Sequence, residues 1–167
     1  MNFVFISPNF PQTYWNFCER LRRRGVNVLG IGDAPYESLS PELKANLTEY
    51  YHVASMEDYD QPFRAVAWFS HKYGKIDWLE SNNEYWLELD ARLRTDFNIT
   101  TGVQMKDIAK FKSKAAQKIY YAKGHVPTAR QQKVTTPEDA KAFLEEVGYP
   151  VIVKPEEIGR ASCRERV

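Results

Sequence analysis

Short apolar runs alternate with amphipathic segments along the first hundred residues of the chain. Four apolar runs are bounded by turn-forming residues, and this pattern predicts buried β-strands. The predicted strands are residues 2–6, 26–31, 49–53 and 76–80. Between these runs, apolar residues recur every three or four positions, which predicts helices that bury one face.

Start and stop signals delimit the predicted helices. Pro11 suits the first turn of a helix that Gly25 ends, and Ser40 before Pro41 is typical of an N-cap with proline at the first helical position. Further helices are predicted over residues 41–47, 59–73 and 83–94. This alternation predicts an α/β fold, in which helices cover an open, mostly parallel, Rossmann-like sheet.

The rhythm changes after about residue 102. A charged helix is predicted over 106–122, another helix over 137–147 behind the cap residue Thr136, and a strand over 151–154. These elements are too few to bury a core by themselves, so they are expected to begin a second domain. The predicted domains are residues 1–103 and residues 104–157.

Composition and charge narrow the class of protein. The formal net charge of +1 gives no general attraction to nucleic acid or to an anionic membrane. The N-terminus lacks the basic region of a signal peptide, and no apolar stretch approaches the roughly 18 residues of a membrane span. Cys18 and Cys163 are the only cysteines, and two thiols make neither a disulfide framework nor a metal site. We therefore expect a cytoplasmic protein.

The loop after the first predicted strand is the first candidate ligand site, because ligands bind beyond the carboxyl ends of strands in open α/β sheets. Its sequence, SPNFP, lacks the GxGxxG pattern of a dinucleotide site. Ser7 and Asn9 are therefore expected to cap the turn and the following helix.

The loop after the fourth predicted strand is the second candidate. Its sequence, ESNN, places Glu80, Asn82 and Asn83 at the carboxyl end of a strand, where they are candidates for lining a substrate pocket. Charged residues early in the following helix are expected to complement its dipole and to form a solvated face. These residues are Glu84, Glu88 and Arg92.

Two lysines stand at a characteristic spacing in KFKSKAAQKIYYAKGHVPTARQQKVTTPEDAKAFLEEVGYPVIVKP, residues 110–155. Lys114 lies thirteen residues before Pro127 of a GHVP turn, and Lys154 ends the strand in VIVKP. This segment resembles the opening of an ATP-grasp domain, with one residue inserted in the turn. The resemblance implies that Lys114 and Lys154 contact the nucleotide phosphates, with Lys112 as a nearby competitor for the first role. A fixed ammonium group suits this task, because it can hold a triphosphate and steady its developing charge.

The resemblance extends to function. The first hundred residues are similar to the pre-ATP-grasp domain of carbamoyl-phosphate-synthase-like ligases of unassigned substrate. It implies that the protein uses ATP and magnesium to turn a small carboxylate into an acyl phosphate, which an amine or other nucleophile attacks. The alternative that the residues leave open is a non-catalytic Rossmann-like module that binds a small ligand or a partner.

The resemblance stops shortly after Lys154. In the family, the lysine–proline strand is followed by a glycine-rich loop and, far downstream, by the Glu and Asn that hold magnesium. Residues 156–167 contain one glycine, and EIGRASCRERV reads as the translation of a common sequencing adapter. Residues 158–167 are therefore expected to be a non-native tail, with a natural basic tail as the alternative. We expect a truncated ligase that is inactive by itself, and we assign no catalytic residue and no metal ligand.

Overall fold

The computed structural model describes residues 1–153 and 165–166. The chain divides into two compact units, Met1–Met105 and Lys106–Val167, and each unit is described separately. The predicted assignment of domain types to residues 1–103, 104–157 and 158–167 stays a prediction. Within the described residues, no helix is both long enough and apolar enough to cross a membrane.

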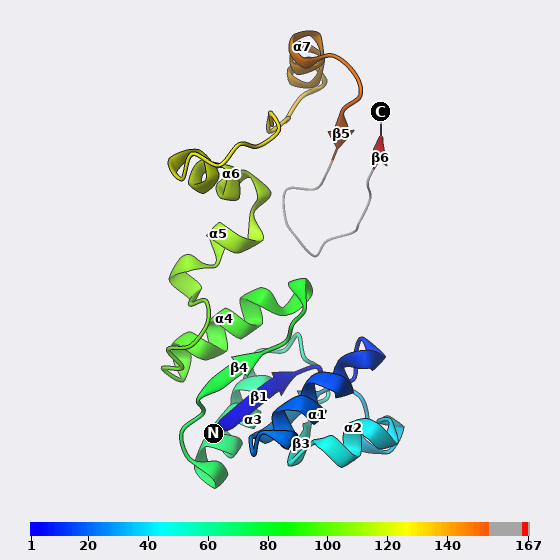
Figure 1. The fold of residues 1–167 in the computed structure, drawn as a ribbon, viewed down its shortest axis with the longest axis vertical. Helices are drawn as coiled ribbons and strands as arrows, with labels where there is room; N and C mark the ends of the chain where they lie inside the picture. Colours follow the sequence, from blue (N-terminus) through cyan, green and yellow to red (C-terminus); the bar gives the residue numbers. More distant parts are fainter. Residues whose placement is uncertain (154–164, 167) are drawn as a thin grey trace. The chain divides into compact units, whose positions relative to one another are not determined.

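Unit 1, Met1–Met105, is built on a four-stranded sheet in the order β3-β2-β1-β4 (Figure 1). All neighbouring strands pair in parallel, which confirms the predicted parallel sheet. Each strand is short, β1 and β2 are buried along almost their whole length, and alternate side chains enter opposite faces of the sheet. The strands are β1 (Asn2–Ile6), β2 (Asn27–Gly32), β3 (Glu49–His52) and β4 (Trp78–Glu80).

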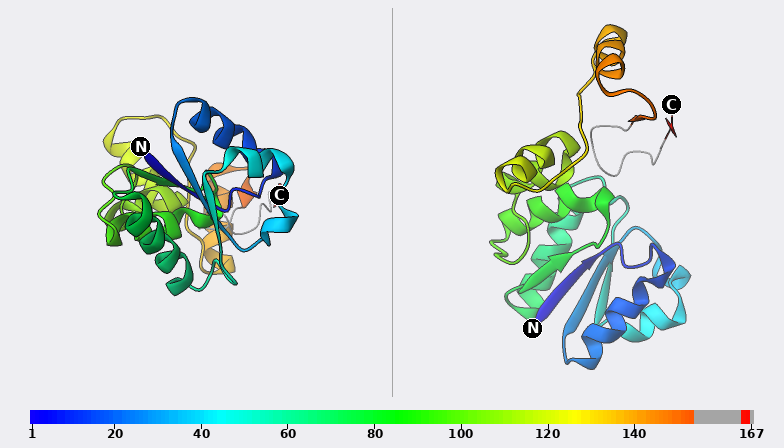
Figure 2. Two further views of the ribbon diagram at one scale, coloured as in Figure 1. Left: turned by 90° about the horizontal axis from the view of Figure 1, so that it is seen from below. Right: turned by 45° about the horizontal axis from the view of Figure 1, so that its top comes forward.

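Helices cover both faces of this sheet (Figure 2). Val4 and Ile6 of β1 pack into one buried cluster with residues of α3 and α4, whereas Phe3 and Phe5 pack into another with residues of α1 and α2. The result is a three-layer α/β arrangement with two cores. The helical elements are η1 (Gln12–Tyr14), α1 (Trp15–Arg23), η2 (Tyr36–Ser38), α2 (Pro41–Asn46), α3 (Asp60–Tyr73), η3 (Glu84–Trp86) and α4 (Leu87–Asp96).

The helix signals of the sequence have mixed outcomes in unit 1. Ser40 caps α2 by accepting a hydrogen bond from the Leu43 N–H at 3.2 Å, as predicted. The expectation that Ser7 and Asn9 cap the first helix is wrong. Pro11 is the N-cap residue of η1, and neither η1 nor α1 receives a side-chain cap. The backbone itself fixes this turn, because Ser7 takes a left-handed conformation and its N–H donates to the Ile31 carbonyl at 2.7 Å.

Unit 2 departs from prediction at one helix. The single helix expected over 106–122 is broken at Ser113, which is extended (φ −92°, ψ 119°) and caps the next helix through the Ala116 N–H at 3.1 Å. Serine favours this role because its hydroxyl satisfies an N–H that the helix leaves unpaired. η4 (Met105–Asp107) begins at the last residue of unit 1, and the elements that lie wholly in unit 2 are α5 (Ala109–Lys112), α6 (Lys114–Lys123), α7 (Pro137–Val147), β5 (Ile152–Val153) and β6 (Glu165–Arg166).

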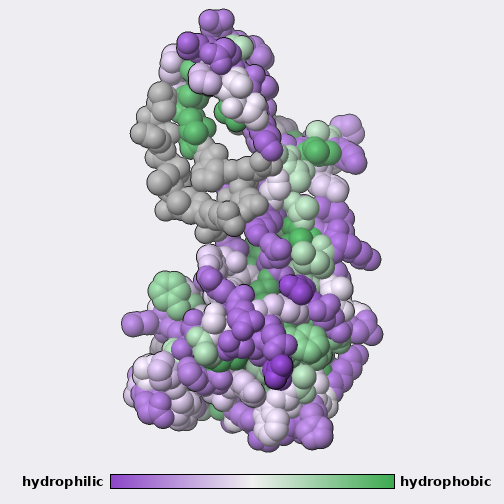
Figure 3. Space-filling model, turned by 180° about the vertical axis from the view of Figure 1, so that it is seen from behind, coloured by the Kyte–Doolittle hydropathy of each residue, from purple (hydrophilic) through white to green (hydrophobic). Residues whose placement is uncertain are grey.

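The remaining elements of unit 2 match the predicted order. Thr136 and Asp139 form a capping box at the start of α7, which begins and ends where the sequence predicts. β5 lies within the strand predicted over 151–154 and pairs antiparallel with β6, which falls in the predicted tail. The origin of that tail stays a prediction. No residue of α5, α6 or α7 is fully buried, and apolar side chains reach the surface there (Figure 3).

Candidate functional site

The strand order of unit 1 places the candidate site between β1 and β4. The helices that follow these adjacent strands lie on opposite faces of the sheet, so the loops after them diverge at the carboxyl edge. Open α/β sheets bind ligands at such a switch point. The Tyr14 hydroxyl, beyond the β1 loop, donates to the Asn82 carbonyl at 2.5 Å and ties the two loops together. The predicted pocket residues thus lie at the expected edge of the sheet, in residues 80–83, here called the β4 loop.

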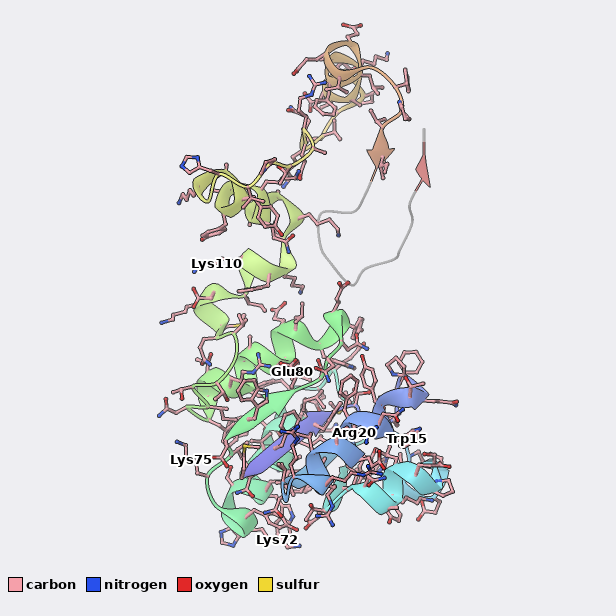
Figure 4. All side chains as sticks on the ribbon, in the orientation of Figure 1. Trp15, Arg20, Lys72, Lys75, Glu80 and Lys110 are labelled. Carbon is pink, nitrogen blue, oxygen red and sulfur yellow. The ribbon has the colours of Figure 1, made fainter. Side chains whose placement is uncertain are left out.

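Glu80, labelled in Figure 4, is the last residue of β4, and its carboxylate bonds to the backbone of the β4 loop. Its Oε2 accepts a hydrogen bond from Arg94 Nη2 at 2.6 Å, which makes an ion pair. Its Oε1 accepts from the backbone N–H groups of Ser81 at 3.2 Å and Asn82 at 3.3 Å. The Glu80 carboxylate therefore fixes the loop backbone, and its predicted contact with substrate stays a prediction.

Arg94 connects this loop to the rest of unit 1. It is 2% exposed, and besides Glu80 it donates to the carbonyls of Leu79 at 2.8 Å and Val103 at 3.1 Å. A buried guanidinium needs such partners, because an unpaired buried charge is strongly unfavourable. Gly102 makes room for it: the residue has φ +83°, and a Cβ there would lie 2.8 Å from Arg94 Cζ.

Asp90 lies on α4, as Arg94 does, and binds the β4 loop through Ser81. It is fully buried, and its Oδ2 accepts from the Ser81 hydroxyl at 2.6 Å and from the Ser81 N–H at 3.0 Å. Its Oδ1 has no hydrogen-bond partner among the described residues. Burial raises the pKa of the Asp90 carboxyl to about 7, because the charged form loses its hydration, and Glu80 adds to that rise.

The two asparagines of the loop have different surroundings. Asn83 caps the next turn, since its Oδ1 accepts from the Tyr85 N–H at 2.9 Å. Asn82 is exposed and has φ +55°, a left-handed conformation that asparagine tolerates better than most residues. Substrate contact by Asn82 or Asn83 stays a prediction. The residues expected on a solvated face are exposed, as predicted: Glu84, Glu88 and Arg92.

Sequence reasoning missed three buried residues of this site: Ser81, Asp90 and Arg94. A signal was present, because Asp90 and Arg94 are one helical turn apart and each adjoins an apolar position of the helix, Leu89 and Leu93. That pattern indicates charges at the edge of a buried face. Only the packing of α4 against β4 identifies their partners.

The candidate nucleotide lysines belong to unit 2. Lys114 is the first residue of α6, directly after the cap residue Ser113, and it is half-buried. Lys112 ends α5, so the break at Ser113 separates the two competing lysines. The N-terminal end of a helix favours anions, which is compatible with a phosphate near Lys114. Lys154 lies outside the described residues. Phosphate contact by either candidate stays a prediction.

We find no candidate group of metal ligands among the described residues. No cluster of three or more His, Cys, Asp or Glu side chains there could hold a metal ion. Cys18 is a buried free thiol whose pKa burial raises to about 12, and Cys163 lies outside the described residues.

The chain is similar in sequence to known ligases. No family model matches the chain. Over 118 residues it is 30% identical to an alanine–anticapsin ligase of Bacillus subtilis strain 168 and 29% identical to one of Bacillus amyloliquefaciens. Each alignment covers 66% of this chain and 25% of the relative. The chain thus spans about a quarter of the length of the curated relatives it matches.

Solved structures show the same architecture. An L-amino acid ligase from Bacillus licheniformis matches 99% of this chain and 38% of its own, with a TM-score of 0.69 and 18% identity. The biotin carboxylase domain of a Hydrogenobacter thermophilus 2-oxoglutarate carboxylase, solved with MgADP, ADP and bicarbonate, matches 92% of this chain and 34% of its own, with a TM-score of 0.68 and 22% identity. The chain shares its fold with these enzymes.

These likenesses confirm the expected fold class. The fold is α/β with a parallel, Rossmann-like sheet, and its assignment to a pre-ATP-grasp domain followed by the first part of an ATP-grasp domain stays a prediction. They also agree with the resemblance to ATP-grasp ligases that the sequence indicates. The substrates and the bound nucleotide named in these comparisons belong to the relatives.

Proposed function

We propose that this chain is the N-terminal part of an ATP-dependent ligase that activates a small carboxylate as an acyl phosphate and transfers it to an amine. The observation that carries the proposal is the 30% identity over 118 residues with an alanine–anticapsin ligase. The fold shared with an L-amino acid ligase supports it independently of sequence identity. We propose a cytoplasmic location, where ATP is supplied, and small molecules as the partners.

The proposal gives the lysines an electrostatic task. Lys114, at the positive end of α6, and Lys154 would hold the phosphates of ATP and offset their charge as the terminal phosphoryl group is transferred. A lysine ammonium suits this task because it can donate to several phosphate oxygens at once. Magnesium would supply further charge neutralisation, and no residue is assigned to it because the described residues contain no group of three or more His, Cys, Asp or Glu side chains that could hold a metal ion.

The β4 loop would bind the substrate in this proposal. Asn82 is the residue most available to a ligand, because its side chain is exposed at the switch point. Glu80 and Asn83 would act from the positions that the Arg94 ion pair and the cap of η3 give them. We also propose that the 167-residue chain is inactive by itself, since the alignment covers only 25% of the alanine–anticapsin ligase that it resembles.

The deciding experiment uses the complete reading frame that contains this sequence. The purified protein is incubated with ATP, magnesium and pairs of L-amino acids, one of them labelled with ¹⁸O in its carboxylate. A ligase that forms an acyl phosphate releases ADP and transfers one ¹⁸O atom to the inorganic phosphate. A protein that binds amino acids but forms no ADP would instead support the non-catalytic binding module.

The lysine assignment has a matched control. Lys114→Ala is expected to weaken ATP binding and to slow ADP formation at least tenfold, whereas Lys112→Ala, two positions away across the helix break, is expected to do neither. The reverse result would transfer the role to Lys112. Equal effects of the two substitutions would remove the assignment altogether.

A further inference from the structure

The Ser81 hydroxyl stands between two acceptors in the β4 loop. Its Oγ lies 2.6 Å from Asp90 Oδ2 and 3.2 Å from the Asn83 carbonyl oxygen. A serine hydroxyl has a single proton to donate, so it can serve one of these acceptors at a time. The hydroxyl also accepts a hydrogen bond from the Asn83 N–H at 3.2 Å. Two hydrogen-bond arrangements are therefore available without movement of the heavy atoms.

The ionised form of Asp90 selects the first arrangement. Its negative Oδ2 attracts the Ser81 hydroxyl proton at the shorter distance, because a charged acceptor makes the stronger hydrogen bond. In this state the Asn83 carbonyl loses its bond from Ser81. The charged Oδ1 also remains buried without a partner among the described residues, which is unfavourable.

The protonated form of Asp90 permits the second arrangement. A proton on Oδ2 can be donated to Ser81 Oγ across the same 2.6 Å, and the Ser81 hydroxyl then donates to the Asn83 carbonyl. The hydroxyl now makes one bond as donor and two as acceptor, which is its full capacity. The orphan Oδ1 becomes the oxygen of a neutral acid, so leaving it unpaired costs less.

The charges around Asp90 keep both forms accessible. Glu80 of β4 raises the pKa of the Asp90 carboxyl and Arg94 of α4 lowers it, and these two are the charged groups that act on it. Burial is the largest influence and brings the pKa to about 7. A carboxyl with a pKa in this range would exchange between the two hydrogen-bond arrangements near neutral pH.

We propose that a proton on Asp90 switches the Ser81 hydroxyl from Asp90 to the Asn83 carbonyl, so that the β4 loop carries a proton-linked hydrogen-bond switch. The switch acts in the loop after β4, where the buried Ser81 is followed by the exposed Asn82 and the half-buried Asn83. It needs no nucleotide and goes beyond the proposed ligation.

The test is an NMR titration of the 167-residue chain in the absence of ligands. The carboxyl carbon of Asp90 and the backbone amides of Ser81 and Asn83 are followed from acidic to alkaline pH. All three signals are expected to titrate with one midpoint near pH 7. The proposal would be overturned if the Asp90 carboxyl carbon does not titrate in this region, or if the Ser81 and Asn83 amide signals do not change with it.

Three variants separate the switch from a purely structural role. Asp90→Asn is expected to abolish the pH response of the Ser81 and Asn83 amides, while Asp96→Asn, the same change at an exposed position of α4, leaves it intact. Ser81→Ala is expected to leave Asp90 titrating but to remove the response of Asn83. An Asn83 amide that still follows Asp90 in Ser81→Ala contradicts the relay. If Asp90→Asn does not fold, the wild-type and Ser81→Ala titrations decide the question.

Discussion

Gly102 and Arg94 fit together so closely that a methyl group at position 102 would overlap the guanidinium. The ideal Cβ position lies 2.8 Å from both Cζ and Nε of Arg94. The same guanidinium forms the ion pair with Glu80 and hydrogen bonds with two backbone carbonyls. The glycine therefore determines whether Arg94 can hold the β4 loop.

A Gly102→Ala substitution is expected to destabilise unit 1 by more than backbone strain alone. Positive φ costs about 1–2 kcal/mol for alanine, and the overlap with Arg94 adds roughly 1–3 kcal/mol. Gly25→Ala is the matched control, because Gly25 has φ +73° and nothing within 4 Å of the added methyl. Urea unfolding followed by tryptophan fluorescence reports on unit 1, since all 4 tryptophans lie there. Equal losses in the two variants would disprove the steric account.

The Arg94–Glu80 ion pair is expected to be coupled more strongly than an exposed pair of the same length. A double-mutant cycle with Arg94→Met and Glu80→Gln should give a coupling free energy of about 2 kcal/mol. The reference pair is Arg64 and Asp60 in the first turn of α3, where Arg64 Nε lies 2.7 Å from Asp60 Oδ2 and the side chains are 73% and 62% exposed. Its cycle should give less than about 1 kcal/mol. Similar couplings would mean that burial does not strengthen the pair at Arg94.

The stability of unit 1 is expected to depend on pH through Asp90. Burial raises the pKa of this carboxyl from 3.8 to about 7, so the folded state binds more protons than the unfolded state between these values. Its stabilising contribution is complete below about pH 4 and is lost as pH rises through about 7. The loss amounts to a few kcal/mol at most. Unfolding free energies of wild type and Asp90→Asn, measured from pH 4 to pH 9, should converge or cross as the wild type weakens. A constant difference across this range would exclude the titration of Asp90.

The break between α5 and α6 is expected to depend on the Ser113 side chain. Ser113→Ala removes the bond to the Ala116 N–H and introduces the best helix former, so residue 113 should become helical and join the two helices. Ser113→Asp keeps a capping oxygen and should keep the break. The ¹³Cα secondary shift at position 113 distinguishes the two states. An alanine that stays extended would show that contacts elsewhere in unit 2 impose the break.

Local signals account for the elements that the sequence predicts correctly. The bounds of β1 and α7 coincide with the predicted ones, because an apolar run ends at a turn in the first case and a capping box precedes the helix in the second. The prediction over 106–122 was wrong for a local reason as well. The prediction gave more weight to the helix-favouring composition of residues 106–122 than to the preference of Ser113 for an N-cap position. In the structure Ser113 is the N-cap residue of α6.

The sequence by itself determined the alternation of strands and helices, the parallel sheet, and the edge at which Glu80, Asn82 and Asn83 stand. These features follow from the periodicity of apolar residues and from the caps, which act over a few neighbouring positions. Only the tertiary structure decided that Asp90 accepts a hydrogen bond from Ser81, that Arg94 forms an ion pair with Glu80, and that Gly102 leaves room for the Arg94 guanidinium. Those contacts join residues up to 14 positions apart. These contacts form because the packing of α4 against β4 removes the side chains of Asp90 and Arg94 from water. A buried ionisable group is unfavourable unless hydrogen bonds or an ion pair replace its hydration.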